Sequence, residues 1–120
     1  DGFATAHSLL PPTPRRGMML IDPSYEIKTD YDLIPGHIRR YARSWNVGII
    51  ALWYPILMDG SHTTMLRMLE EVHPDAMRHE VRFTPAKQGH GMLGSGMFII
   101  NAPYGTDTTA KHLTKVFAPL

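Results

Sequence analysis

The chain is predicted to be an α/β protein with a mixed sheet, and three features of its sequence carry that prediction. Two apolar runs, at residues 18–22 and 47–54, have the length and composition of buried parallel strands. A stretch with helical spacing lies between them, as a parallel crossover requires. The last two expected strands are joined by a loop without a helix, which indicates that they pair antiparallel.

The expected elements alternate along most of the chain. They are a short helix within the connector 4–17, a strand at 18–22, a helix at 36–45, a strand at 47–54, a helix at 59–72 capped by Asp59 or Ser61, strands at 79–84 and 97–101, and a helix at 107–117.

Prolines and glycines set several of these boundaries. Helical spacing already begins at a possible N-cap, Thr29 or Asp30, but Pro35 should break or kink that helix. Pro55 is expected to close the second strand, because proline has no N–H to offer a sheet. A glycine-rich loop at 87–94 is expected to join the last two strands.

The composition is that of one small globular domain and excludes several classes of protein. The 120 residues are 43% hydrophobic and 19% charged, and no apolar run approaches the ~20 residues of a membrane-spanning helix. No basic segment followed by an apolar core opens the chain, so export is not indicated. The absence of cysteine excludes disulfides and thiolate metal sites and agrees with a cytoplasmic location. Seven scattered histidines lack the spacing of metal ligands, so no metal is assigned.

The net charge of +1 is too small to indicate nucleic-acid binding by itself. Any RNA contact must therefore come from local clusters, of which the sequence offers Arg15–Arg16 and Arg39–Arg40–Arg43. Such clusters form solvated faces more often than binding sites, and both interpretations stay open at this point.

The tetrad Asp22-Pro23-Ser24-Tyr25 is the most informative stretch of the chain. It follows the first buried strand, and in open α/β sheets ligands collect at the carboxyl ends of the strands. The Asp22 carboxylate can accept one N–H of an exocyclic amino group, the Pro23 carbonyl can accept the other, and the Tyr25 ring can stack on the base. This set points to methylation of an amino nitrogen, with Asp22, Pro23 and Tyr25 as the catalytic residues. The alternative is an ordinary Asp-Pro turn.

Segments spread over nearly all of residues 1–104 resemble one family, with the spacing from Asp1 to Asp22 kept. The family is that of the bacterial 23S ribosomal RNA adenine-N6 methyltransferases of the large-subunit methyltransferase J type. The segments that carry the resemblance are Asp1–Phe3, Leu10–Pro12, Arg15–Gly17, Leu20–Pro23, Tyr25–Glu26, Lys28–Tyr31, Ala51–Pro55, Gly91–Met92, Ser95–Met97, Ile100–Asn101 and Pro103.

The resemblance implies a fold, a cofactor and a set of site residues. The fold is the second half of a Rossmann-like class I methyltransferase sheet with an antiparallel last strand, and the cofactor is S-adenosyl-L-methionine. Asp22 is implied as the proton acceptor and a cofactor contact, and Asp1-Gly2 as the pair that reaches the cofactor adenine. His90 and Ser95 belong to a loop near the target base and are, with Tyr25, the implied substrate-binding residues.

Residues 1–120 are expected to be the C-terminal part of a single methyltransferase domain, without the half that carries the cofactor loop. Such a fragment would be inactive alone, and the full-length protein is expected to be a monomer that acts on ribosomal RNA. Ser24 replaces the family's second proline, which loosens the loop but leaves the Pro23 carbonyl in place. Tyr54 could wall the pocket, although closing the core is the favoured role.

Three other interpretations of the whole chain stay open. It could be a truncated, catalytically silent α/β fold that binds RNA or a partner protein. It could belong to a DNA adenine-N6 methyltransferase, since the tetrad serves both nucleic acids. It could also be a plain α/β module whose tetrad is only a turn.

Overall fold

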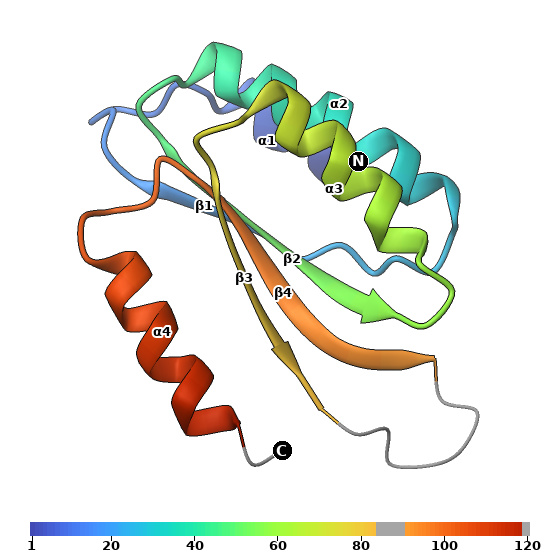
Figure 1. Cartoon of the computed structure of the whole chain (residues 1–120). Helices are drawn as coiled ribbons and strands as arrows, with labels where there is room; N and C mark the ends of the chain where they lie inside the picture. The colour runs from blue at the N-terminus through green and yellow to red at the C-terminus, as the bar shows by residue number, and fades with distance from the viewer. Residues whose placement is uncertain (84–90, 119–120) are drawn as a thin grey trace.

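A computed structural model describes residues 1–83 and 91–118 of the chain and shows a mixed α/β fold (Figure 1). Within these residues, four strands form one sheet in the order β1-β2-β4-β3. The elements in chain order are α1 (Gly2–Ser8), β1 (Met18–Ile21), α2 (Thr29–Ser44), β2 (Ile49–Leu57), α3 (Ser61–Val72), β3 (Met77–Arg82), β4 (Met92–Ile100) and α4 (Thr106–Phe117). Helices α1, α2 and α3 lie together on one side of the sheet, and α4 lies on the other (Figure 1).

The strand pairing is the one that the sequence predicts. β1 and β2 run parallel, with Ile21 opposite Leu52 and α2 as the crossover between them. β4 runs antiparallel to both of its neighbours, β2 and β3. The last two strands therefore pair antiparallel, and the predicted fold class is confirmed.

The core lies between the sheet and helices α2 and α3. Alternate residues of β2 face these helices, because successive side chains of a strand point to opposite sides of the sheet. The buried cluster includes Ile50, Leu52, Tyr54 and Ile56 of β2, Ile34, Ile38 and Tyr41 of α2, and Met65, Leu66 and Leu69 of α3. Each such side chain contributes about 1.5–3 kcal/mol on burial, which holds the carboxyl ends of β1 and β2 in place.

Helix α2 is continuous through Pro35, so the predicted break there is wrong. Proline cannot donate a hydrogen bond to the carbonyl of Tyr31, and a proline inside a helix costs about 3 kcal/mol. The side chains of Tyr31, Ile34 and Pro35 are all buried in this turn. Their burial, at about 1.5–3 kcal/mol each, offsets the cost of the missing bond.

Strand β2 also continues through a proline, so the prediction that Pro55 closes it is wrong. In the described part of the chain, β1 pairs with β2 only as far as Leu52, and beyond that residue this edge of β2 has no strand beside it. The Leu57 N–H donates to His62 Nδ1 at 3.1 Å. Pro55 lies two residues earlier and turns its nitrogen to the same edge, where no sheet bond is lost.

Strand β4 begins five residues earlier than the predicted 97–101 and takes in part of the expected glycine-rich loop. Its glycines serve close packing between strands. A Cβ on Gly96 would lie 2.3 Å from Cζ of Tyr54, and one on Gly94 would lie 2.2 Å from the carbonyl oxygen of Val81. The strand needs glycine at both places because a neighbouring ring and a neighbouring backbone approach it.

We expect Gly96→Ala to lower the free energy of unfolding by about 1–3 kcal/mol, because the added methyl group must displace the buried Tyr54 ring. Urea denaturation measures the change. Gly91→Ala is the matched control, since a Cβ on Gly91 would have no atom within 4 Å. Equal stability of the two variants would contradict the expectation.

The remaining boundaries differ from the predicted ones by one or two residues. β1 ends at Ile21, β3 covers Met77–Arg82, α4 begins at Thr106, and residue 84 of the predicted third strand lies outside the described residues. The capping residues differ as well: Lys28 precedes α2 without a side-chain cap bond, and Gly60 precedes α3. The Asp59 carboxylate supplies part of the expected cap of α3 by accepting the Ser61 N–H at 2.9 Å.

Candidate active site

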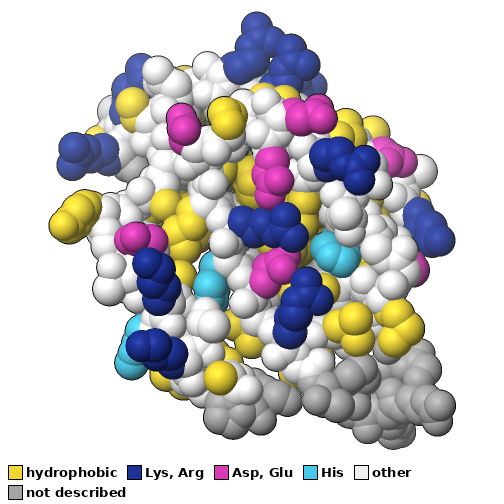
Figure 2. Space-filling view, viewed as in Figure 1, with side chains coloured by type: hydrophobic (Ala, Val, Ile, Leu, Met, Phe, Trp, Pro, Cys, Tyr) yellow, Lys and Arg dark blue, Asp and Glu magenta, His cyan; other side chains and the backbone are white. Residues whose placement is uncertain are grey.

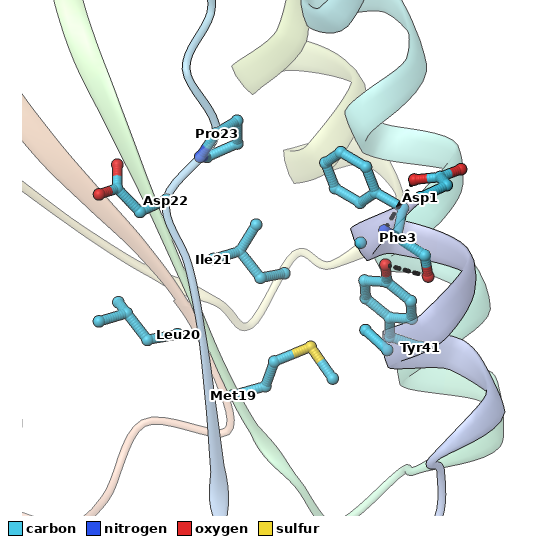
Figure 3. Close-up of a pocket in the computed structure, with 10 residues that line it drawn as sticks. Asp1, Phe3, Met19, Leu20, Ile21, Asp22, Pro23 and Tyr41 are labelled. Carbon is cyan, nitrogen blue, oxygen red and sulfur yellow. Dashed lines mark hydrogen bonds between the residues drawn. The ribbon is translucent and has the colours of Figure 1, made fainter.

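Asp22 follows β1 directly, at the carboxyl end of the strand. Side chains alternate along β1, so that Met19 and Ile21 point toward α1 and Tyr41, while Leu20 and Asp22 point the other way (Figure 3). Asp22 is exposed. Its carboxylate is therefore accessible to a ligand at the edge of the sheet where such folds bind their ligands.

A hollow of about 390 Å³ lies between β1 and α1 and brings together the predicted cofactor residues. Asp1, Gly2, Asp22 and Pro23 all line it, and the rest of its lining is Phe3, Ala6, Met19, Leu20, Ile21 and Tyr41. Asp1 is also the N-cap of α1, because its Oδ1 accepts the Phe3 N–H at 2.9 Å. The hollow thus has a largely apolar lining, with Asp1 and Asp22 from different elements at its border and the Asp22 side chain turned away from α1.

Two contacts fix α1 against α2 and so fix this wall of the hollow. The Tyr41 hydroxyl donates to the Phe3 carbonyl at 2.8 Å, as the dashed line in Figure 3 marks. The Phe3 ring stacks on the ring of His37, with centroids 4.3 Å apart. Because both partners lie on α2, the position of Asp1 and Gly2 depends on the same helix that packs on the sheet.

Tyr25 is held by its hydroxyl as well as by its ring. The hydroxyl donates to the Trp53 carbonyl at 2.6 Å, on the edge of β2 that β1 has left free. The ring lies against Tyr31, with centroids 4.8 Å apart. Burial raises the pKa of Tyr25, and the nearby Tyr31 and Asp22 raise it further, so the hydroxyl stays a neutral donor.

The backbone at Tyr25 adopts a φ of 56°, in the left-handed region that aromatic residues rarely occupy. Such a conformation costs on the order of 1–3 kcal/mol and persists only where the surroundings hold it. The bond to Trp53 and the contact with Tyr31 are the interactions that hold it here. The stacking of Tyr25 on a base stays a prediction, and the structure adds a second role, which is to fix the end of the tetrad.

Tyr54 belongs to the core, as favoured, and does not line the hollow. Its side chain is fully buried, and its hydroxyl donates to Glu80 at 2.9 Å across the glycine at position 96. Glu80 also binds Arg78 and Arg82, and Arg78 binds Glu70 of α3. Figure 2 shows acidic and basic side chains alternating down the middle of this face of the molecule.

Of the implied substrate-binding residues that the structure describes, neither Tyr25 nor Ser95 lines the hollow beside Asp22. Ser95 lies within β4, opposite Pro55 of β2. Ile21, Leu52 and Phe98 are in line across the sheet, which puts Ser95 about 10 Å further along and two strands away from the end of β1. His90 lies outside the described residues. A contact of Ser95 with the target base therefore stays a prediction.

None of the described helices is both long enough and apolar enough to cross a membrane. No group of three or more His, Cys, Asp or Glu side chains in residues 1–83 and 91–118 could hold a metal ion.

Comparisons with known proteins match this chain over most of its length. The family model described as "Ribosomal RNA large subunit methyltransferase D, RlmJ" matches residues 1–119. The chain belongs to this family. It is 35% identical over 124 residues to the ribosomal RNA large subunit methyltransferase J of Haemophilus influenzae, and 37% identical over 108 residues to that of Escherichia coli K12.

The RlmJ-family relatives are more than twice as long as this chain. The alignments cover 99% and 87% of the chain but only 44% and 38% of the Haemophilus and Escherichia proteins. The crystal structure of protein LPL1258 from Legionella pneumophila is similar with a TM-score of 0.88 and 34% identity, over 97% of this chain and 43% of that one. The chain thus spans less than half the length of the relatives it matches.

Sequence reasoning missed the strand carbonyl and the second ring that hold the tetrad. Trp53 contributes through its backbone, which no side-chain motif reveals, and Tyr31 has no predicted role beyond its place in the segment Lys28–Tyr31 of the family resemblance. One signal was present in the sequence. The run at 47–54 is longer than the run at 18–22. If the two pair as parallel strands, the longer strand extends past the end of the shorter one, and the residues that follow 18–22 lie beside its unpaired edge.

Proposed function

We propose that the complete protein is an S-adenosyl-L-methionine-dependent methyltransferase that acts on the N6 amino group of an adenine in 23S ribosomal RNA. The observation that carries this proposal is the tetrad Asp22–Tyr25 at the carboxyl end of β1, in a chain of the RlmJ family. The names of the relatives support the choice of large-subunit ribosomal RNA over DNA. The protein would act as a monomer in the cytoplasm.

The chemistry proposed for the tetrad is mainly positioning. The lone pair of an adenine amino group is delocalised into the ring, so the nitrogen must be held in line with the methyl donor. The Asp22 carboxylate would accept one N–H and the Pro23 carbonyl the other. When the new N–C bond forms, one N–H bond must break, and Asp22 is the group that takes that proton.

The residues around the hollow fit the cofactor that the family implies. S-adenosyl-L-methionine supplies the methyl group when bound. The exposed carboxylates of Asp1 and Asp22 can accept hydrogen bonds from amino and hydroxyl groups of a ligand that extends beyond the hollow, and the apolar lining suits an adenine ring. The space beside the Gly2 backbone is open to a ligand, because a Cβ at this position would have no atom within 4 Å.

We propose further that residues 1–120 form the C-terminal part of one methyltransferase domain whose remaining strands continue the sheet beyond β1. β1 is an edge strand in the described residues, yet Met18 and Leu20 on it are each 62% exposed. An exposed apolar edge strand is unfavourable in water, and pairing with an additional strand removes the exposed edge. More than half of each relative's sequence lies outside the match, which is long enough to supply the further strands.

We expect residues 1–120 alone to bind S-adenosyl-L-methionine weakly or not at all, because the proposed N-terminal half of the domain would supply the other wall of the hollow. Isothermal titration calorimetry of this fragment, compared with the full-length protein, measures the difference. Micromolar binding to the fragment would contradict the proposed division of the domain.

The proposed activity is tested with the full-length protein and methyl-labelled S-adenosyl-L-methionine. Protein-free 23S ribosomal RNA should accept one methyl group, recovered as N6-methyladenine, while duplex DNA of mixed sequence should not. Equal labelling of DNA would favour a DNA adenine methyltransferase. Cofactor binding without labelling of either nucleic acid would favour the silent fold that binds RNA or a protein.

A further inference from the structure

Helix α2 and the segment beside its second half carry most of the arginines that form no ion pair in the described residues; the remaining one, Arg67, lies apart on α3. Arg78 and Arg82 are paired with Glu70 and Glu80. In the described residues, the arginines on and beside the second half of α2 have no ion pair, although they are exposed: Arg15, Arg16, Arg39, Arg40 and Arg43. We call these five residues the α2 arginine surface.

The surface is hollowed rather than flat. Arg39, Arg40 and Arg43 line a hollow of about 450 Å³ on the flank of α2. Arg40 and Arg43 also line a second hollow of about 280 Å³, which reaches His7 of α1. Basic side chains stand at the upper rim of the molecule in Figure 2, where the helices lie.

Two of the arginines are oriented by neutral partners. Arg40 donates to His37 Nδ1 at 2.8 Å, and the pKa of His37 is lowered by burial and by Arg40, which keeps the imidazole neutral. Arg15 donates to the Asn46 side chain at 3.1 Å. These bonds position the guanidinium groups without neutralising their charge, and each group keeps further N–H donors.

We propose that the α2 arginine surface binds backbone phosphates of the RNA substrate, outside the site at Asp22. This inference rests on the proposed function. Five unneutralised guanidinium groups are concentrated here in a chain whose net charge is only +1, and the guanidinium fork matches the geometry of phosphate oxygens. Phosphate contacts of this kind supply affinity and orientation but no sequence information.

The position of α2 suits such a role. The helix begins four residues after Tyr25, and Arg39 to Arg43 lie 10 to 14 residues further, or about 15–21 Å along its axis. A duplex presents on the order of ten phosphates over that length. An RNA whose adenine enters the site at Asp22 is thus large enough to reach this surface as well.

The test uses the full-length protein with Arg39, Arg40 and Arg43 all changed to glutamine. We expect Kd and KM for 23S ribosomal RNA to rise about tenfold or more near physiological salt, and the slope of log Kd against log salt to fall by about 2–3. The kcat at saturating RNA and the Kd for S-adenosyl-L-methionine should stay unchanged. Changing the same three residues to lysine should restore most of the binding, because the charge returns.

A matched control removes the same charge elsewhere. Arg67, Lys111 and Lys115 are exposed on α3 and α4, and their triple change to glutamine should leave RNA binding nearly unchanged. The inference is overturned if the α2 triple variant binds RNA like wild type, or if the control weakens binding equally. It is also overturned if the α2 arginines are needed for binding to phosphatidylserine vesicles but not to RNA.

The outcomes separate this inference from the proposed function. A wild-type protein that methylates RNA, with RNA binding insensitive to the α2 arginines, contradicts the surface alone. A wild-type protein that methylates no RNA, but whose RNA binding depends on these arginines, contradicts the proposed activity and leaves the surface supported.

Discussion

Asp22→Ala in the full-length protein should lower turnover by at least about 100-fold. The change removes the side-chain acceptor that would align the amino group and the base that would take its proton, and general-base contributions alone are about 10²–10⁴-fold. The loss should appear in kcat, because alignment and proton transfer act mainly in the transition state. Single-turnover transfer of labelled methyl to 23S ribosomal RNA is the measurement.

Two further variants make this result interpretable. Asp22→Asn keeps the size of the side chain and one acceptor oxygen but is a far weaker base, so it should retain more positioning than alanine and still lose proton acceptance. Asp75→Ala removes an exposed carboxylate from the turn before β3 and should leave turnover unchanged. Wild-type turnover in Asp22→Ala would place the chemistry at another residue.

Tyr25→Phe should lower kcat by about tenfold, although the ring is kept. The change leaves the Trp53 carbonyl without its partner at 2.6 Å and removes one of the two interactions that hold the left-handed backbone at position 25. A lost hydrogen bond of this kind costs about 1–3 kcal/mol, and the consequence is a looser Asp22 and Pro23. Methyl transfer at saturating RNA, with KM nearly unchanged, measures this positioning effect.

Tyr25→Ala separates the ring from the hydroxyl. If the ring stacks on the adenine, this variant should also weaken RNA binding by about 1–3 kcal/mol, which Tyr25→Phe should not. Equal RNA affinity of the two variants would refute stacking, while wild-type kcat in Tyr25→Phe would refute the positioning role of the hydroxyl. The two roles therefore fail independently.

The local patterns of the sequence were sufficient for the fold class but not for its boundaries. The apolar runs at 18–22 and 47–54 are dominated by burial, so periodicity identifies them. Pro35 and Pro55 were misjudged because each is tolerated through long-range features, namely the buried face of α2 and the edge of β2 beyond the end of β1. The glycines of β4 predict a loop when only the local sequence is considered. They are required within a strand because the Tyr54 ring and the Val81 backbone, both distant in sequence, lie against them.

The candidate site also has one part that the sequence predicts and another that depends on long-range structure. Asp1, Gly2, Asp22 and Pro23 were predicted from the sequence and its resemblance, and they do line one hollow. The bond from Tyr25 to a carbonyl 28 residues away depends on strand register, which a side-chain motif does not encode. Register also decides that Ser95 lies in the middle of a strand, two strands from β1.

The sheet order has a consequence for synthesis on the ribosome. β4 is the last strand in the described part of the chain, but it lies between β2 and β3 and joins them. Until Met92–Ile100 has emerged, neither β2 nor β3 has its partner on that side, so the nascent sheet carries unpaired edges for the time in which some twenty further residues are made. A ribosome that stops shortly before this strand releases a product without the centre of its sheet, and we expect cells to aggregate or degrade it.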